Sequence, residues 1–88
     1  MYYVYVLQRA TNPKEIYFGF SNDLKRRVVE HQKIAPSYTG ERRGWKLVYY
    51  EAYASEKDAR DREKMLKQYG SAKGHLKNRI RRSLHIEN

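Results

Sequence analysis

The chain has 88 residues, no cysteine, and a net charge of +9 from 19 lysines and arginines against 10 aspartates and glutamates. This length predicts one domain, residues 1–88, with a modest core. The lack of cysteine excludes a disulfide framework and a thiolate zinc site, and the positive charge predicts an extended anionic partner, with nucleic acid as the leading class.

The N-terminal residues do not show the pattern of a secretion signal. Met1 is followed directly by strand-like residues, without the basic and apolar segments and the cleavage site of a signal peptide. No apolar run approaches the ~20 residues that cross a bilayer. We therefore expect a soluble, cytoplasmic protein.

Two aromatic and β-branched segments, residues 2–7 and 16–20, predict a β-hairpin. The residues between them contain an Asn-Pro pair, which predicts a loop. Because side chains alternate between the two faces of a strand, we expect Tyr5 on one face of the first segment. Tyr17 and Gly19 should likewise share one face of the second.

A helix is expected after the hairpin. Ser21 or Asn22 can cap its first turn. Its apolar residues follow helical spacing from Leu24 onward, so Arg27 and His31 border the inward stripe.

The segment after this helix, residues 33–44, contains proline, glycine, serine and threonine, a composition typical of loops. It also carries Tyr38, Arg42 and Arg43. Aromatic and basic loop residues of this kind are often placed to contact a ligand.

Residues 45–53 predict a third strand, with Leu47 and Tyr49 on one side and Val48 and Tyr50 on the other. This assignment assumes an unbroken alternation along the strand.

A longer helix should begin at Ser55, whose spacing to an acidic residue resembles a capping box, and end near Tyr69. Its apolar stripe includes Ala59 and Leu66. Glu63 lies on the same stripe, and a carboxylate placed where a core residue is expected needs a functional or structural reason.

A last helix is expected to start at Ser71, with a narrow apolar seam that includes Leu76 and Leu84. From residue 60 onward the chain has 9 basic and 3 acidic side chains, against 10 and 7 in the first 59 residues. The positive charge is therefore concentrated toward the C-terminal helices, which can hold a phosphate backbone by releasing counterions.

Two short motifs and three later positions carry a family resemblance. Residues 3–5 (Tyr-Val-Tyr) and 17–19 (Tyr-Phe-Gly) lie on the predicted hairpin, Arg27 and His31 on the next helix, and Glu63 on a later one. In this order and spacing they resemble the GIY-YIG nuclease domain superfamily, in particular its small stand-alone bacterial members. The likeness covers nearly the whole chain.

The resemblance implies an α+β fold with a three-stranded antiparallel sheet flanked by helices, in chain order β-β-α-β-α-α. It also implies that the protein is a metal-dependent endonuclease, using Mg²⁺ or Mn²⁺ to hydrolyse DNA phosphodiester bonds. Structure-selective action in repair or recombination is the corresponding expectation. Specificity would then come from the loop around residues 38–43, the C-terminal helices or a partner protein.

The resemblance also implies roles for individual residues. Glu63 would hold the metal ion, and Arg27 would neutralise charge on the transferring phosphoryl group. His31 would assist near the scissile phosphate, and Tyr5 or Tyr17 would help to activate the attacking water. The choice between the two tyrosines stays open.

The chemistry of these side chains suits the implied roles. A guanidinium donates two parallel hydrogen bonds and keeps its proton, as a phosphodiester transition state requires. A single carboxylate leaves most of a Mg²⁺ coordination sphere to water and phosphate oxygens. Glu51, near the end of the third predicted strand, is a competing metal ligand. The residues expected to contact nucleic acid are Gly19, Ser21, Lys25, Tyr38, Arg42, Arg43, Lys67, Lys73 and Lys77.

The same side chains are also compatible with roles outside catalysis. The tyrosines can be ordinary strand residues, and Glu63 can form a structural ion pair with Arg27 or Arg60. The runner-up function is a non-catalytic nucleic-acid-binding module that uses the tyrosines as stacking platforms. A third is a protein-interaction domain with a tyrosine-rich surface.

Overall fold

The computed structural model describes residues 1–27, 29 and 45–84 of the chain. The strands and helices defined in them are β1 (Tyr2–Arg9), β2 (Asn12–Ser21), β3 (Trp45–Tyr53), α2 (Glu56–Gln68), α3 (Gly70–Arg79) and α4 (Arg81–Leu84). The sheet is antiparallel with strand order β2-β1-β3. The predicted α+β fold, a three-stranded antiparallel sheet flanked by helices, is confirmed.

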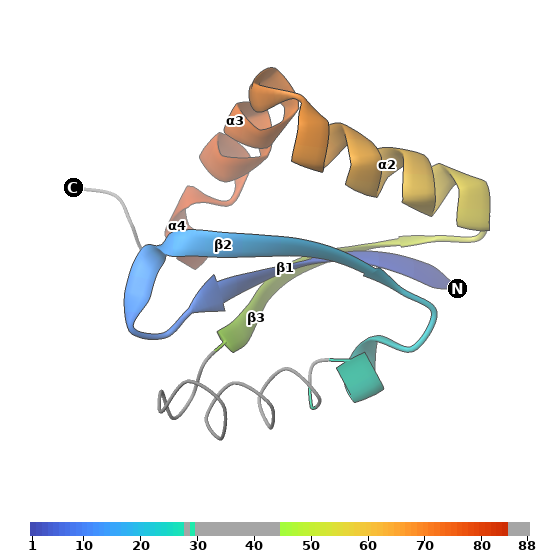
Figure 1. Ribbon diagram of the computed structural model, residues 1–88, viewed down its shortest axis with the longest axis horizontal. Coiled ribbons are helices and arrows are strands. Elements are labelled where there is room, and N and C mark those ends of the chain that lie inside the picture. Colours follow the sequence, from blue (N-terminus) through green and yellow to red (C-terminus); the bar gives the residue numbers. More distant parts are fainter. Residues whose placement is uncertain (28, 30–44, 85–88) are drawn as a thin grey trace.

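Helices flank the sheet on both sides (Figure 1). α2 and α3 lie over one face, and residues 24–27, which are also helical, lie beyond the other. None of the helices in the described part of the chain is long and apolar enough to cross a membrane.

The hydrophobic core lies between the sheet and helices α2 to α4. β-Branched and aromatic side chains of β1 and β2 meet the apolar stripe of α2 and the seam of α3 and α4. The buried core residues are Val4, Val6, Phe18, Ala59, Leu66, Leu76, Ile80 and Leu84.

A buried amide joins the end of the chain to the sheet. Gln8 is 1% exposed, and its Nε2 donates to the carbonyl oxygens of Pro13, at 2.8 Å, and of Leu84. A buried amide without partners would be costly, so these two hydrogen bonds specify where α4 docks.

The hairpin turn is shorter than the sequence predicts. β2 already begins at Asn12 and includes Pro13, where we expected a loop. Proline is accommodated because it lies in a register shift: Gln8 pairs with Ile16 and Arg9 with Asn12, so Pro13 has no ladder partner on β1. An ion pair of 2.7 Å between Arg9 Nε and Glu15 Oε1 joins the two strands at this end.

A register shift in β3 corrects the predicted alternation. Val6 pairs with Tyr49 but Leu7 pairs with Leu47, so Val48 is an extra residue. Such a bulge re-aims the side chains that follow it. Leu47 and Tyr49 therefore lie on opposite sides of the sheet, not on the same side.

The predicted last helix is also interrupted. Helix α3 begins at Gly70, one residue before the expected start, and ends at Arg79. Ile80, with φ −108° and ψ 28°, separates it from α4. Ile80 and Leu84 are nevertheless buried, so the predicted apolar seam is present in two pieces.

The sheet face away from α2 is built around Tyr5 and Gly19, which are directly paired across β1 and β2. Tyr5 is 1% exposed. A Cβ at position 19 would lie 2.7 Å from Cε1 of Tyr5, and closer still to Cζ and Oη. The Tyr5 ring therefore occupies the space that any side chain at position 19 would need.

Replacing Gly19 by alanine should lower the free energy of unfolding by about 1–3 kcal/mol through overpacking against Tyr5. Urea denaturation measures this change. Gly74→Ala is the matched control, because an added Cβ there meets nothing within 4 Å and alanine favours a helix interior by about 0.8–1.0 kcal/mol. Unchanged stability of the Gly19 variant would contradict the packing.

Candidate active site

Tyr17 lies at the edge of the sheet, beside Tyr5. The two ring centroids are 6.3 Å apart with a tilt of 45° between the planes, and the Tyr17 ring also lies 6.2 Å from that of Trp45. The two tyrosines differ in access, since Tyr17 is 38% exposed whereas Tyr5 is 1% exposed. Tyr17 is therefore accessible to solvent, while the buried Tyr5 ring packs beside it.

The carboxylate of Glu63 lies on the flank of α2 that faces β2. Its Oε2 is 3.1 Å from Lys67 Nζ, and the same ammonium lies 5.4 Å from the centroid of the Tyr17 ring. The i, i+4 spacing on the helix makes the ion pair possible. Lys67 thus connects Glu63 to Tyr17, two residues that are 46 positions apart in the sequence.

Glu63 is not a core residue, although it shares the stripe of Ala59 and Leu66. Those two residues are fully buried, whereas the Glu63 side chain is 20% exposed at the border of the stripe. Glu63 forms its ion pair with Lys67. The alternative given above, a structural ion pair with Arg27 or Arg60, is therefore not what the structure shows. Its carboxylate is therefore accessible to a ligand.

Arg27 lies on the first helical turn after β2. Its backbone N–H donates to the Asp23 carbonyl at 3.2 Å, and its side chain is exposed. The turn is held by Asp23, whose carboxylate accepts from Arg26 N at 3.2 Å, and by Ser21, whose hydroxyl accepts from Asp23 N at 2.9 Å. Ser21 is 4% exposed, so it supports this turn from within.

The remaining predicted contact residues are spread over the molecule. Lys25 is exposed and lines a hollow of about 540 Å³ together with Tyr3 and Tyr50. Lys73 of α3 lies 5.9 Å from the Phe18 ring centroid, and Lys77 is partly buried on the same helix. The other predicted residues, His31, Tyr38, Arg42 and Arg43, lie outside the described residues.

Glu51, the competing metal ligand, faces the helices, and each of its two carboxylate oxygens accepts two hydrogen bonds. Arg62 donates to it twice, from Nε at 3.0 Å and from Nη2 at 3.1 Å. The Tyr49 hydroxyl donates at 2.7 Å, and the Tyr53 hydroxyl donates to the other oxygen. Glu51 pairs with Val4 across the ladder, on the face away from Tyr5.

The network around Glu51 shifts the pKa values of all four of its members: it lowers that of Glu51 and raises those of Tyr49, Tyr53 and Arg62. Burial raises the pKa of the carboxyl, but hydrogen bonds from Arg62, Tyr53 and Tyr49 outweigh it and hold this pKa below its ordinary 4.5. Burial and the hydrogen bond to Glu51 raise the pKa of Tyr53 to about 12. These shifts accompany a structural ion pair between Glu51 and Arg62. The two-residue spacing of Tyr49, Glu51 and Tyr53 in the sequence indicates only that they share one face of the strand.

Of the two carboxylates, Glu63 is the more accessible to a metal ion. Among residues 1–27, 29 and 45–84, no three histidine or acidic side chains are grouped to hold a metal. A metal at Glu63 would have one carboxylate from the described residues, a ligand type that suits Mg²⁺ with its retained waters. The other oxygen of the Glu63 carboxylate, Oε1, has no ion pair or hydrogen bond to another described residue. This oxygen is therefore a suitable ligand for Mg²⁺.

Glu51→Gln should lower the free energy of unfolding at pH 7 by about 1–3 kcal/mol, since it weakens a charge-assisted network. Because the folded pKa of Glu51 lies below its unfolded value, the stabilisation is complete above about pH 4.5 and is lost as the pH falls through the folded pKa. The difference from the native chain should therefore shrink below pH 4.5 in urea titrations. Asp61→Asn, in an exposed pair with Lys57, is the control, and equal behaviour of the two variants would contradict a special role for Glu51.

Comparison with known proteins identifies the family. Residues 1–79 match the family model described as the GIY-YIG catalytic domain. A UPF0213 protein of Bacillus pumilus is 33% identical over 76 residues, which cover 85% of this chain and 76% of that protein. UPF0213 protein CPE1444 of Clostridium perfringens is 34% identical over 68 residues, 76% of this chain and 71% of that protein.

A further UPF0213 protein, from Limosilactobacillus reuteri, is 43% identical over 61 residues, which cover 66% of this chain and 62% of that protein. No solved structure matches the chain significantly. The match to the family model spans β1, β2, β3 and α2, which carry Tyr5, Tyr17 and Glu63. The chain therefore belongs to the GIY-YIG catalytic domain family, which is a family of nucleases.

Proposed function

We propose that the protein is a divalent-metal-dependent endonuclease that hydrolyses phosphodiester bonds of DNA. The observation that carries the proposal is the contact of an accessible carboxylate, Glu63, with Lys67 and through it with Tyr17 at the sheet edge. At the β2 edge of the sheet, the carboxylate can bind a metal ion and the ammonium can contact a phosphate. The phenol can form a hydrogen bond with water.

In this proposal Glu63 holds the metal ion. When bound, Mg²⁺ or Mn²⁺ would polarise a phosphate oxygen and lower the pKa of a coordinated water. A cation held by Glu63 would compete with Lys67, whose ammonium is 3.1 Å from Glu63 Oε2. The Lys67 ammonium would remain beside the site, where it can meet the negative charge of the substrate.

Tyr17 is the better candidate to orient the attacking water. The Tyr17 ring is exposed at the edge of the sheet where Glu63 lies, whereas the Tyr5 ring is buried against the backbone of Gly19. A hydroxyl in hydrogen-bond reach of water can fix the direction of attack without giving up its own proton. We assign Tyr5 a positioning role, because its ring packs against that of Tyr17.

Arg27 is proposed to bind the transferring phosphoryl group. Its side chain is exposed, and a guanidinium always carries charge and donates two parallel hydrogen bonds. His31 is proposed to assist beside it. We further propose structure-selective action in repair or recombination, and the substrate panel below tests which DNA structure is preferred.

Metal binding gives a test that does not depend on turnover. Mn²⁺ titrated into the native protein in a calorimeter should bind, and Glu63→Gln should abolish the binding. Lys67→Met should strengthen it by up to about fivefold, because an exposed ion pair of up to about 1 kcal/mol no longer competes. Glu56→Gln, which breaks the equivalent pair with Arg60, should leave it unchanged. Undiminished binding by the Glu63 variant would exclude this residue as the ligand.

Cleavage of labelled duplex, nicked, flap, branched and single-stranded DNA in Mg²⁺ or Mn²⁺, with EDTA as the control, tests the reaction. Arg27→Ala should slow cutting by about 10²- to 10³-fold, as loss of a transition-state donor does elsewhere. The neighbouring Arg26→Ala removes an equal charge, paired loosely with Asp23 at 3.9 Å, and should have little effect. Salt-sensitive binding without cutting on every substrate would instead establish a non-catalytic binding module.

A further inference from the structure

Three cationic side chains of α2 and α3 each lie over an aromatic ring of β2. Arg60 Cζ is 4.2 Å from the centroid of the Phe20 ring. Lys67 Nζ is 5.4 Å from that of Tyr17, and the Lys73 ammonium is 5.9 Å from that of Phe18. Cation–π contacts of this length are attractive, so the rings hold three positive charges along one strand.

The spacing of these contacts follows from the way α2 lies on β2. Arg60 meets Phe20 and Lys67 meets Tyr17, so helix and strand are antiparallel. Seven helical residues advance about 10.5 Å and three strand residues about 10 Å, so the two elements stay in step. Glu63 is three residues after Arg60 and four before Lys67, and therefore lies between the two cations.

All three cations can reach a ligand. Arg60 pairs with Glu56 through Nε at 2.9 Å and its side chain is 59% exposed, which leaves other guanidinium donors available. The Lys67 side chain is 46% exposed. Lys73 forms no ion pair with any described residue.

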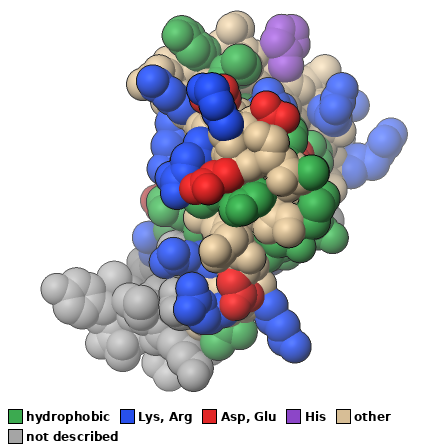
Figure 2. All heavy atoms as spheres, turned by 90° about the vertical axis from the view of Figure 1, so that its right-hand side faces the viewer, with side chains coloured by type: hydrophobic (Ala, Val, Ile, Leu, Met, Phe, Trp, Pro, Cys, Tyr) green, Lys and Arg blue, Asp and Glu red, His purple; other side chains and the backbone are tan. Residues whose placement is uncertain are grey.

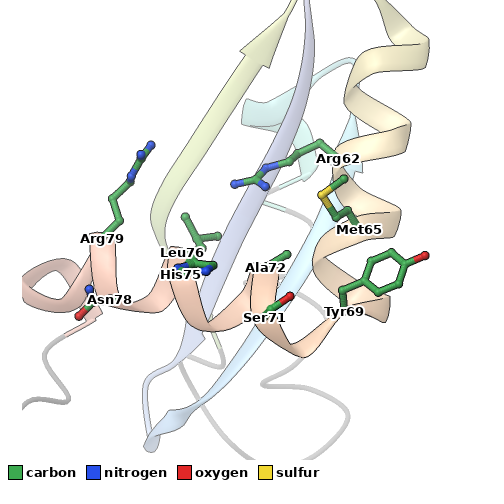
Figure 3. Close-up of a pocket in the computed structure, with 9 residues that line it drawn as sticks. All are labelled: Arg62, Met65, Tyr69, Ser71, Ala72, His75, Leu76, Asn78 and Arg79. Atoms are coloured by element: carbon green, nitrogen blue, oxygen red, sulfur yellow. The ribbon is translucent and has the colours of Figure 1, made fainter.

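A second basic flank lies on the opposite side of α2. Lys and Arg side chains gather on two sides of the helical layer in Figure 2. Figure 3 shows a groove of about 700 Å³ between α2 and α3 on the β3 flank, into which Arg62 and Met65 project. Arg62 is held by two hydrogen bonds to Glu51, and the other arginine lining this groove, Arg79, is exposed and forms no ion pair with a described residue.

We propose that Arg60, Lys67 and Lys73 form a row of phosphate-binding cations along β2, here called the phosphate track. A DNA strand bound to this track would pass over Glu63. The inference deepens the proposed function and rests on it. Nucleotides of one strand advance about 3.4 Å along the axis of a duplex, so the span of about 10 Å between Arg60 and Lys67 corresponds to about three nucleotide steps along that axis. The phosphate at Glu63 then lies between two that are neutralised by cations.

The track is tested by DNA binding without cutting. Affinity for a labelled DNA in EDTA, measured by fluorescence anisotropy between about 50 and 200 mM salt, gives the slope of log K against log salt. Arg60→Gln, Lys67→Gln and Lys73→Gln should each reduce that slope by about 0.9, the value for one lost phosphate contact. Urea denaturation confirms that the variants are folded.

Arg79→Gln is the matched control for Lys73→Gln. Both residues lie on α3 and neither forms an ion pair with a described residue, but Arg79 lines the groove on the β3 flank. An unchanged slope for Arg79→Gln supports the track. An equal or larger loss for Arg79→Gln, unchanged slopes for the three track variants, or no DNA binding at all would overturn it. Reduced slopes in a protein that cuts no DNA would retain the track and reject the nuclease.

Discussion

The position of Tyr17 depends on the contact between the Tyr5 ring and the backbone at Gly19. The buried ring fills the space that a side chain at position 19 would take, so the phenol packs directly on the backbone of β2. Tyr17, two residues from Gly19 and packed against Tyr5, is thereby placed at the sheet edge. The same edge receives α2, whose Lys67 and Arg60 meet the rings of β2.

The two carboxylates near α2 show how environment separates structural from functional roles. Glu51 is saturated by Arg62, Tyr49 and Tyr53, and these hydrogen bonds keep it charged and hold β3 to α2. Glu63 pairs with a single flexible lysine and stays partly exposed. A single lysine partner suits the metal-binding role proposed for Glu63, whereas a carboxylate with four donors suits a permanent contact.

The elements could be predicted from sequence because their signals are local. Strand alternation placed Tyr5, Tyr17 and Gly19 on shared faces, and helical spacing placed Glu63 beside Ala59 and Leu66. The register shift at Val48, the early start of β2 at Asn12, and the break at Ile80 could not be predicted. Each of these features depends on contacts between segments that are distant in the sequence, and local sequence patterns do not encode such contacts.

The same limit applies to the candidate site. The resemblance implied a metal ligand at Glu63, and the i, i+4 spacing of Lys67 from it is visible in the sequence. Only the structure shows that the Lys67 ammonium also lies 5.4 Å from the centroid of the Tyr17 ring. Arg60 had no motif of its own, and its place over Phe20 depends on the antiparallel fit of α2 to β2. Glu51 remained a competing ligand at the level of sequence, because no local pattern shows that Arg62 lies across from it.

The most direct test of the central claim, that Glu63 is the metal ligand, compares the two carboxylates in one DNA cleavage assay with Mg²⁺, at a temperature where all proteins are folded. Glu63→Gln and Glu51→Gln make the same change of charge and shape on opposite flanks of α2. We predict that the Glu63 variant binds DNA but does not cut it, while the Glu51 variant is less stable but still cuts. Cutting by the Glu63 variant, or loss of cutting only in the Glu51 variant, would contradict the assignment of Glu63.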